Sequence, residues 1–265
     1  MTAANASLFD RYKRHVLEGH ALAGVNIDEV FVRRFYTALA EPDRDMVDGG
    51  ANRGLHSVPM SRLLARGSGQ VFSFEPIPAV ADLLDAALCE AGARNVTVFR
   101  QALSDHEGSA EFTWVRNLDG QSGILPRRHY SETPDIQRIP VALTTLDAAL
   151  AARDPFFIKL DLEGGEFPAL RGATGLLARS RPVIAFENDL AVSAEIYGYG
   201  EADFFAFFSA QRYLPFDLVG QAVVPGNWRT GLLWQFLAFP EDRAGPLLEL
   251  TLRIMAGTVA DFDAR

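Results

Sequence analysis

Cysteine and lysine are both scarce in this sequence. The chain of 265 residues holds a single cysteine, Cys89, which excludes an intrachain disulfide. Because Cys89 lies in an apolar segment with helical spacing, we expect a buried, unreactive thiol. Lysine occurs only at Lys13 and Lys159, and arginine supplies the other basic side chains. Most arginines are therefore expected on the solvated surface, and the lysine at position 159 calls for a specific explanation.

Long apolar runs and an excess of positive charge are also missing. No stretch approaches the roughly 18 apolar residues of a membrane helix, and the N-terminus offers no signal-peptide core. The net charge of -9 argues against a general affinity for nucleic acid, which needs a basic surface. We expect one cytoplasmic α/β domain over residues 1–265, with no nucleic-acid or membrane partner and an acidic character that suits a cationic ligand.

Strand and helix patterns alternate from Asp45 onward, which is typical of a parallel sheet covered on both faces. The first predicted elements are strands at 45–48, 70–75 and 95–100 and helices at 55–66 and 78–91. After an interruption the later ones are strands at 156–161, 182–187, 213–219 and 232–239 and helices at 167–178 and 202–212. Residues 45–239 form this core, and 240–265 form a C-terminal extension.

Two further segments lie outside this alternation. Residues 9–39 have roughly helical apolar spacing and predict one or two helices, so residues 1–44 are interpreted as a helical cap, with a lid or dimer element as the alternative. Residues 104–154 are an insertion with strand-like pieces at 110–115 and 138–143 and a polar loop at 117–123. Long loops in compact domains concentrate function, so the insertion is expected to face the substrate.

The stretch DMVDGGANRG at 45–54 predicts a strand, a tight glycine turn and a helix, with backbone N–H groups converging where a ligand can dock. Gly49, Ala51 and Gly54 fit a relaxed G-x-A-x-x-G spacing, and Glu75 follows at the second strand tip, which suits either NAD or S-adenosylmethionine. The carboxylate of Asp48 would repel a pyrophosphate but suits a cationic sulfonium and ammonium. That Asp48 instead caps the turn or the helix stays open.

Carboxylates also end the fourth and fifth predicted strands. A regular strand places Lys159, Asp161 and Glu163 on one side, at the mouth of a site on the sheet's carboxyl edge. Asp161 could then take a proton from an acceptor hydroxyl, although an ion pair with Lys159, or helix capping by Glu163 and the nearby Glu166, would also explain these residues. Glu187 ends the next strand in the same way.

Five stretches carry a resemblance to a known family. They are VDGGANRGLHS, FEPIP, NVTVFRQALSDHEG, IKLDLEGGEFPALRG and PVIAFE, in this order between residues 47 and 187. Together they resemble the FkbM family of S-adenosylmethionine-dependent methyltransferases, which is associated with O-methylation of sugar, glycan and polyketide hydroxyls. The resemblance implies a Rossmann-like class I methyltransferase fold with a mostly parallel seven-stranded sheet, N-terminal helices and an insertion between the third and fourth strands.

The resemblance also implies roles for individual residues. It places Glu75 at the ribose, Gln101 and Ala102 beside the adenine, and a loop with Asn117 and Ser122 toward the acceptor. Gly49 stands where the family commonly has a branched aliphatic residue. The loop on the methionine side would comprise Asp48, Gly49, Gly50, Asn52 and Gly54.

For the chemistry we expect an in-line displacement in which the acceptor oxygen attacks the sulfonium methyl. Asp161 is the expected base, Glu163 or Glu187 orients the hydroxyl, and Lys159 holds the carboxylate. His56 and His129 are rival bases, and His129 is also a candidate acceptor contact. Magnesium held by Asp161, Glu187 and Asp189 is an alternative that we do not expect. A nicotinamide-dependent oxidoreductase, a cofactor-binding protein without catalysis, and a homodimer also remain open.

Overall fold

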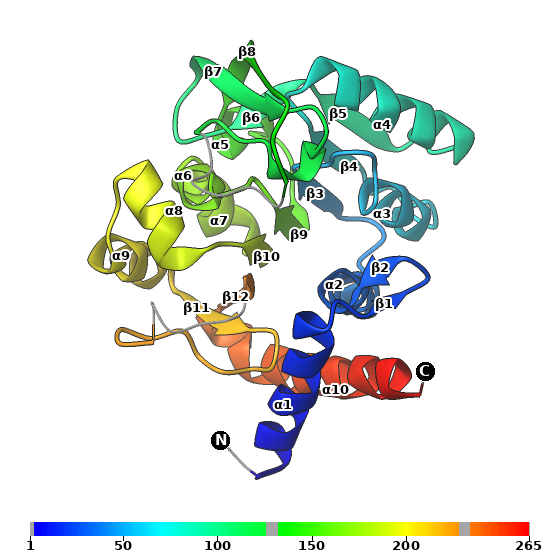
Figure 1. Cartoon of the computed structure of the whole chain (residues 1–265), viewed down its shortest axis with the longest axis vertical. Helices are drawn as coiled ribbons and strands as arrows, with labels where there is room; N and C mark the ends of the chain where they lie inside the picture. The colour runs from blue at the N-terminus through cyan, green and yellow to red at the C-terminus, as the bar shows by residue number, and fades with distance from the viewer. Residues whose placement is uncertain (1–2, 126–131, 228–233, 265) are drawn as a thin grey trace.

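A seven-stranded sheet runs through the middle of the molecule (Figure 1). The computed structural model describes residues 3–125, 132–227 and 234–264. In spatial order the strands are β11 (Tyr213–Asp217), β12 (Gln235–Pro240), β10 (Val183–Glu187), β9 (Pro155–Leu160), β3 (Asp45–Gly49), β4 (Val71–Phe74) and β5 (Val96–Phe99). Neighbouring strands are parallel, except that β12 runs antiparallel to both β10 and β11. The expected mostly parallel seven-stranded sheet is confirmed.

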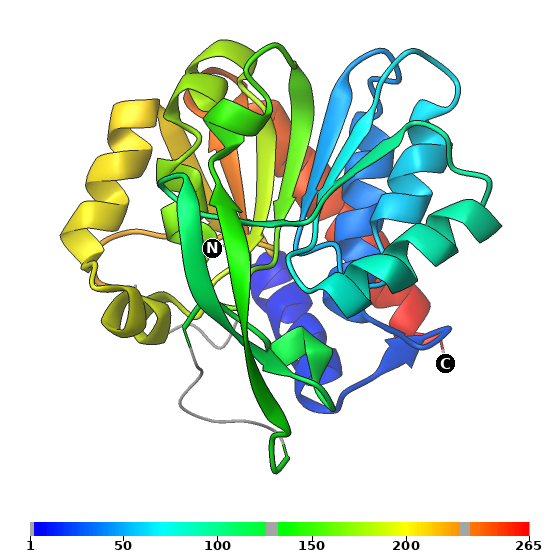
Figure 2. The same ribbon diagram turned by 90° about the horizontal axis from the view of Figure 1, so that it is seen from above.

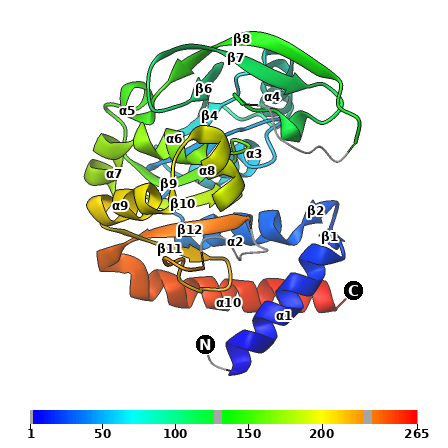
Figure 3. The ribbon, with the colours of Figure 1, turned by 60° about the vertical axis from the view of Figure 1, so that its left-hand side comes forward.

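Helices cover both faces of this sheet (Figure 3). Successive side chains of a strand point to opposite faces, so Met46 of β3 packs into one apolar cluster and Val47 into the other. The first face carries α1 (Ala3–Leu17), α2 (Ile27–Leu39), α3 (Ser57–Leu64) and α10 (Ala244–Asp263). The second carries α5 (Leu146–Ala149), α6 (Glu166–Arg171), α7 (Thr174–Ser180), α8 (Leu190–Tyr197) and α9 (Glu201–Gln211).

The two ends of the chain meet on the first face (Figure 1). The N-terminal segment forms two helices, α1 and α2, joined by the small hairpin of β1 (Ala21–Leu22) and β2 (Val25–Asn26). The segment expected as a C-terminal extension is a short η2 (Glu241–Arg243) followed by α10, which packs against both α1 and α2. Both terminal segments therefore complete the main core.

The insertion builds a second, three-stranded sheet (Figure 2). Its strands are β6 (Gln101–Leu103), β8 (Ile136–Thr144) and β7 (Gly108–Val115), in this spatial order, and η1 (Asp119–Gln121) follows β7. Phe112 and Val141 of this sheet pack against Val80 at the start of α4 (Pro78–Glu90). The insertion is thereby fixed beside the carboxyl ends of β3, β4 and β9.

Two local expectations were wrong. The predicted helix 167–178 is two helices, because the chain bends at Gly172, where a side-chain Cβ would lie 2.2 Å from the carbonyl oxygen of Ser104. The thiol of Cys89 is exposed, because the neighbouring Leu84 and Leu88 form the buried stripe of α4 and residue 89 is rotated out of it.

In the part of the chain that the structure describes, no helix combines the length and apolarity needed to cross a bilayer.

Candidate active site

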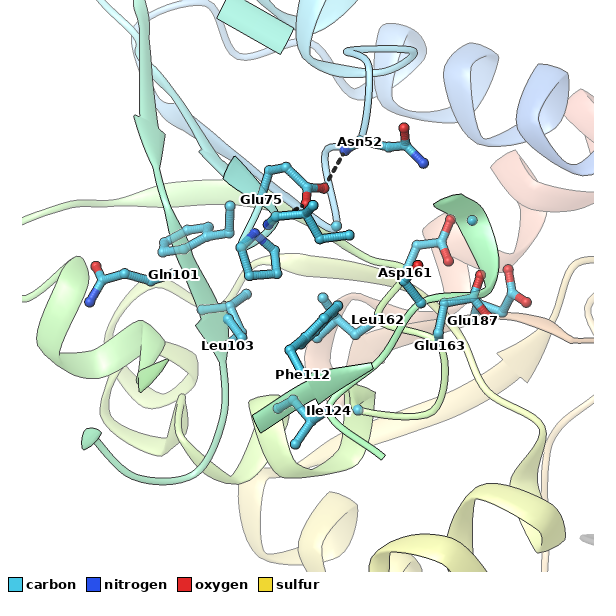
Figure 4. A pocket seen from close by; sticks show the side chains of 18 residues that line it. Asn52, Glu75, Gln101, Leu103, Phe112, Ile124, Asp161, Leu162, Glu163 and Glu187 are labelled. Carbon is cyan, nitrogen blue, oxygen red and sulfur yellow. Dashed lines mark hydrogen bonds between the residues drawn. The ribbon is translucent and has the colours of Figure 1, made fainter. Parts of the chain in front are cut away.

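A cavity of about 170 Å³ lies where the carboxyl ends of the central strands meet the inserted sheet (Figure 4). Its floor comes from the glycine loop after β3, the segment after β4, and the ends of β9 and β10. Its other walls come from β6, β7 and the segment around η1. The lining residues are Gly50, Asn52, Phe74, Glu75, Pro76, Ile77, Gln101, Ala102, Leu103, Phe112, Gly120, Ser122, Ile124, Asp161, Leu162, Glu163, Gly165 and Glu187.

The glycine loop is pressed against the end of β9. Gly50 has a φ of 76°, and a Cβ at this position would lie 1.8 Å from the carbonyl oxygen of Asp161. Asn52 and Gly54 are also left-handed, with φ values of 46° and 86°. Such a backbone, with no room for a side chain at position 50, requires glycine there.

The N–H groups of this loop are used within the protein, which differs from our expectation. Those of Gly50 and Ala51 both donate to the carbonyl oxygen of Phe74 at 3.0 Å. The N–H of Asn52 donates to a carboxylate oxygen of Glu75 at 3.0 Å. Since the N–H of Gly54 also bonds within the loop, to the carbonyl of Ala51, these groups hold the loop in shape and form no phosphate cradle.

Three residues expected in the methionine-side loop lie outside the cavity lining among the described residues: Asp48, Gly49 and Gly54. Asp48 is 1% exposed, and its Oδ2 accepts a hydrogen bond from Ser57 Oγ at 2.5 Å, near the start of α3. Asp48 lies inside β3, two residues after Met46, so its side chain shares the face that α2 covers. Asp48 therefore links β3 to α3, the two elements that flank the loop.

Gly49, the departure from the family pattern, is closely packed. A Cβ on Gly49 would lie 2.8 Å from Leu160 Cδ2 and 3.0 Å from Leu103 Cδ1. These two side chains occupy the space that a branched residue would take. Glycine at position 49 therefore lets Leu160 and the cavity-lining Leu103 pack closely against the loop.

Glu75 is held in a defined orientation at the cavity. Its Oε2 accepts the N–H of Asn52 at 3.0 Å, and its Oε1 accepts the N–H of Ile77 at 2.9 Å. Both oxygens of the carboxylate are thus oriented by backbone donors, one on each side (Figure 4). Gln101 and Ala102, expected beside the adenine, line the same cavity from β6.

Asp161 follows β9 and forms an ion pair with Lys159. The ammonium of Lys159 lies 3.0 Å from Asp161 Oδ2, and the lysine side chain is only 4% exposed. Burial alone lowers the pKa of Lys159, but Asp161, Glu29 and Asp48 outweigh it and raise that pKa above its ordinary value. Lys159 is therefore a buried cation that contacts Asp161 and is stabilised electrostatically by three carboxylates.

The strand does not stay regular beyond Leu160, as the sequence argument had assumed. Glu163 has a φ of 56° and Gly164 a φ of 104°, so the chain turns here. Glu166 stabilises this turn by accepting the N–H groups of Leu162 at 2.6 Å and Gly164 at 3.2 Å. The turn brings Glu163 to the cavity.

Glu187 completes a group of four cavity carboxylates with Glu75, Asp161 and Glu163. Its Oε2 accepts a hydrogen bond from Gln235 at 3.1 Å, so β12 positions the tip of β10. Among the described lining residues there is no lysine, arginine or histidine. The cavity wall itself therefore favours a cationic ligand and disfavours an anionic one.

The remaining candidates lie in several different places, and among the described ones only Ser122 lines the cavity. Ser122 lines the cavity, with its Oγ accepting the N–H of Val115 at 3.0 Å. Asn117 is exposed and joins the two arms of the insertion by bonding to Thr133 and Asp135. His56 is buried outside the cavity lining and bonds through Nε2 to Glu29. His129 lies outside the described residues.

The apolar part of the wall was missed by the sequence argument. Phe112, Ile124 and Leu103 line the cavity beside the carboxylates (Figure 4). The signal for Phe112 was present, because β7 alternates polar and apolar residues. Within the described ranges, no three histidine, cysteine or acidic residues are grouped so that they could hold a metal ion.

The chain matches one protein family and has some similarity to several solved structures. The model of the methyltransferase FkbM domain matches residues 48–215, which is more than half of the chain. No curated protein is significantly similar in sequence. Similar solved structures include an FkbM methyltransferase from Methylobacillus flagellatus KT, with 18% identity and a TM-score of 0.47 over 75% of this chain and 44% of that one.

Two further structures have comparable scores. The precorrin-6y C5,15-methyltransferase from Geobacter metallireducens GS-15 is 17% identical, with a TM-score of 0.42 over 70% of this chain and 73% of that one. The O-methyltransferase TomG from Streptomyces achromogenes, solved with S-adenosylmethionine, is 14% identical, with a TM-score of 0.45 over 91% of this chain and 90% of that one. On the extent of the domain match, the chain belongs to the methyltransferase FkbM domain family.

Proposed function

We propose that this protein transfers a methyl group from S-adenosylmethionine to a hydroxyl of a sugar, glycan or polyketide-type small molecule. One observation carries the proposal: four carboxylates and no basic side chain line the described cavity at the carboxyl edge of the sheet. The family assignment supports methyl transfer.

The residues of the cavity fit S-adenosylmethionine. When bound, this cofactor supplies an electrophilic methyl group on a positively charged sulfur. The fixed carboxylate of Glu75 suits the hydroxyls of a ribose, as in other sheets of this type. Asp161 and Glu163 supply negative charge for the sulfonium and the ammonium.

A nicotinamide dinucleotide fits less well. Its pyrophosphate would face the same four carboxylates at short range, where like charges repel. The N–H groups of Gly50, Ala51 and Asn52, which would have to bind it, already donate within the protein. The oxidoreductase alternative is therefore disfavoured on both charge and hydrogen bonding.

Asp161 is the proposed general base. An aliphatic hydroxyl is a poor nucleophile, so a carboxylate that accepts its proton contributes as the new bond forms. Lys159 fixes Oδ2 of Asp161, and Glu163 and Glu187 are proposed to orient the acceptor. Holding the reactants in line contributes roughly 7 to 11 kcal/mol. No metal is needed in this scheme.

The acceptor is proposed to be uncharged, hydroxyl-rich and partly apolar. Phe112, Ile124 and Leu162 offer apolar surface next to Glu163 and Glu187. The carboxylates disfavour phosphorylated or sulfated acceptors.

Asp161→Asn tests this function. The variant should still bind S-adenosylhomocysteine, because the sulfur of this ligand is uncharged, the amide keeps the shape of the carboxylate, and Glu163 still faces the ammonium. Its turnover should fall about 100-fold or more, because the base is lost. Affinity is measured by calorimetry, and turnover with methyl-labelled S-adenosylmethionine and a panel of sugars and macrolide aglycones.

Asp135→Asn is the matched control, since Asp135 is exposed and pairs with Arg116 on the surface of the insertion. The control should turn over like the wild type. Calorimetry that shows binding of NAD and none of S-adenosylhomocysteine would reverse the proposal. Unchanged turnover in Asp161→Asn would remove Asp161 as the base, and inhibition by EDTA with rescue by magnesium would refute the metal-free scheme.

A further inference from the structure

Helix α2 is joined to the chain that directly follows the glycine loop. Its residues Glu29 and Arg33 are one turn apart and share a face. The carboxylate of Glu29 bonds to His56 Nε2, and Nη2 of Arg33 donates to the carbonyl oxygen of Leu55 at 3.3 Å. Although α2 lies before the region matched by the family, it thus holds the segment that leads from the loop into α3.

Glu29 is also one of the buried charges that surround the Lys159 ammonium. The side chains of Glu29 and His56 are 13% and 3% exposed. Burial alone raises the pKa of Glu29, but Lys159, His56 and Arg33 outweigh it and lower this pKa to about 2. Glu29 is therefore an anion at neutral pH.

The packing of α2 places Lys159 on the same side of the sheet as Glu29. Tyr36 of α2 packs edge-on against both His56 and Phe157 of β9. Lys159 follows Phe157 by two residues in β9, so its side chain lies on the sheet face that α2 covers. Glu29 thus acts from α2 on the same ammonium that pairs with Asp161 in the cavity wall.

We propose that Glu29 is a positioning residue for S-adenosylmethionine, which acts by sharing the Lys159 ammonium and so keeping the negative charge of Asp161 effective in the cavity. This inference rests on the proposed function. Without the charge of Glu29, the ammonium is compensated chiefly by Asp161 and Asp48, and the cavity becomes less negative. The cofactor's sulfonium would feel this change directly.

The ratio of two affinities isolates this effect. S-adenosylmethionine carries a positive sulfur, whereas the sulfur of S-adenosylhomocysteine is a neutral thioether, and the rest of the two molecules is alike. A general loss of structure weakens both ligands, but a change in cavity charge weakens mainly the cation. Glu29→Gln should lower the affinity for S-adenosylmethionine relative to S-adenosylhomocysteine by about three- to tenfold.

Asp28→Asn is the control, because it removes the same charge from the same turn of α2. The hydroxyl of Tyr12 in α1 bonds to Asp28, which therefore lies toward a different helix. Burial raises the pKa of Asp28 to about 6, so calorimetry is done at pH 8, where the wild-type group is ionised. The control should leave the affinity ratio unchanged, and thermal unfolding checks that both variants fold.

If Glu29→Gln fails to fold, Arg33→Gln provides a second test, in which the affinity ratio should change in the opposite direction. Removing this positive charge from the same face should raise the ratio in favour of S-adenosylmethionine. Equal ratios in the wild type and the Glu29 variant, or in the wild type and the Arg33 variant, would overturn the inference. A wild type that binds neither ligand would overturn the proposed function as well, so the two failures are distinguishable.

Discussion

Gly50 leaves no room for a side chain in this site. Its missing side chain lets the loop after β3 approach the carbonyl of Asp161, and its positive φ suits no other residue well. The same contact sets the relative position of two walls of the cavity. The shape of the glycine loop and the position of Asp161, the proposed base, therefore depend on the same close contact between Gly50 and the Asp161 carbonyl.

Gly50→Ala should destabilise the protein by about 2 kcal/mol or more, because the left-handed backbone costs about 1 kcal/mol and the new methyl must displace a backbone oxygen. The matched control is Gly257→Ala in α10, where no atom lies within 4 Å of the added Cβ. It should stabilise by about 0.5–1 kcal/mol. Urea unfolding measures both, and an unaltered midpoint for Gly50→Ala would contradict the packing described.

The strand-tip acids show what the sequence could and could not predict. The pattern places both Asp48 and Glu75 near strand ends, where ligands bind in parallel sheets. Asp48 nevertheless lies within its strand and faces α2, whereas Glu75 comes after its strand and reaches the cavity. This difference depends on where each strand stops, to within one residue, and local pattern does not determine that point.

At the scale of elements, the turn between β9 and α6 carries one glutamate that lines the cavity and another that stabilises the turn itself. Glu163 supplies a carboxylate to the cavity, while Glu166, three residues later, is buried and accepts two backbone N–H groups. Burial, with a further contribution from Asp161, raises the pKa of Glu166 to about 8, against the effect of its hydrogen bonds. Its folded-state pKa is thus above the ordinary value.

Glu166→Gln should make stability less dependent on pH. The contribution of a group with a raised pKa is fully present below its unfolded value, and is lost as the pH rises through about 8. For this one group the slope is at most about 1.4 kcal/mol per pH unit. The glutamine keeps an oxygen for the two N–H groups and cannot ionise.

Urea unfolding at pH 5, 7 and 9 measures this prediction. As the pH rises, the free energy of unfolding of the variant should increase relative to that of the wild type. Parallel pH profiles would show that Glu166 does not change its protonation state on folding.

The inserted sheet marks the limit of prediction for elements. Its strands at 110–115 and 138–143 were correctly predicted in type, because each alternates polar and apolar residues. The sequence pattern did not predict β6, in which the chain leaves the main sheet after Arg100 and Gln101 pairs with Ala142. The partner strand is some forty residues away, and local pattern carries no information about it. Likewise, the need for glycine at position 172, between α6 and α7, comes from the carbonyl of Ser104, which is distant in the sequence.

At the scale of the whole molecule, the family-matched region depends on segments outside it. Helices α2 and α10 both bury apolar side chains on the first face of the sheet. Full burial of one large apolar side chain stabilises by about 1.5–3 kcal/mol. The sum for α2 alone is comparable to the whole stability of a typical domain, about 5–15 kcal/mol. The buried apolar residues of α2 are Ile27, Phe31, Val32, Phe35 and Tyr36, and those of α10 include Leu247, Met255 and Val259.

A chain that begins at residue 45 should therefore fail to fold. Circular dichroism should show no cooperative thermal transition, because the first face of the sheet would expose its apolar side chains to water. A chain that begins at residue 18 loses α1 only and should retain a transition at lower temperature. Cooperative unfolding of the chain that begins at residue 45 would show that the sheet folds without α1 and α2.

The place of β12 in the sheet has a consequence for synthesis. β12 is the last strand in the sequence, yet it lies between β10 and β11 and is the only strand that pairs with β11 in the described sheet. Until residues 235–240 leave the ribosome, the apolar edge of β10 has no partner, and such edges pair readily with other chains. The edge of β10 is thus exposed to aggregation until β12 has been made and has paired with it.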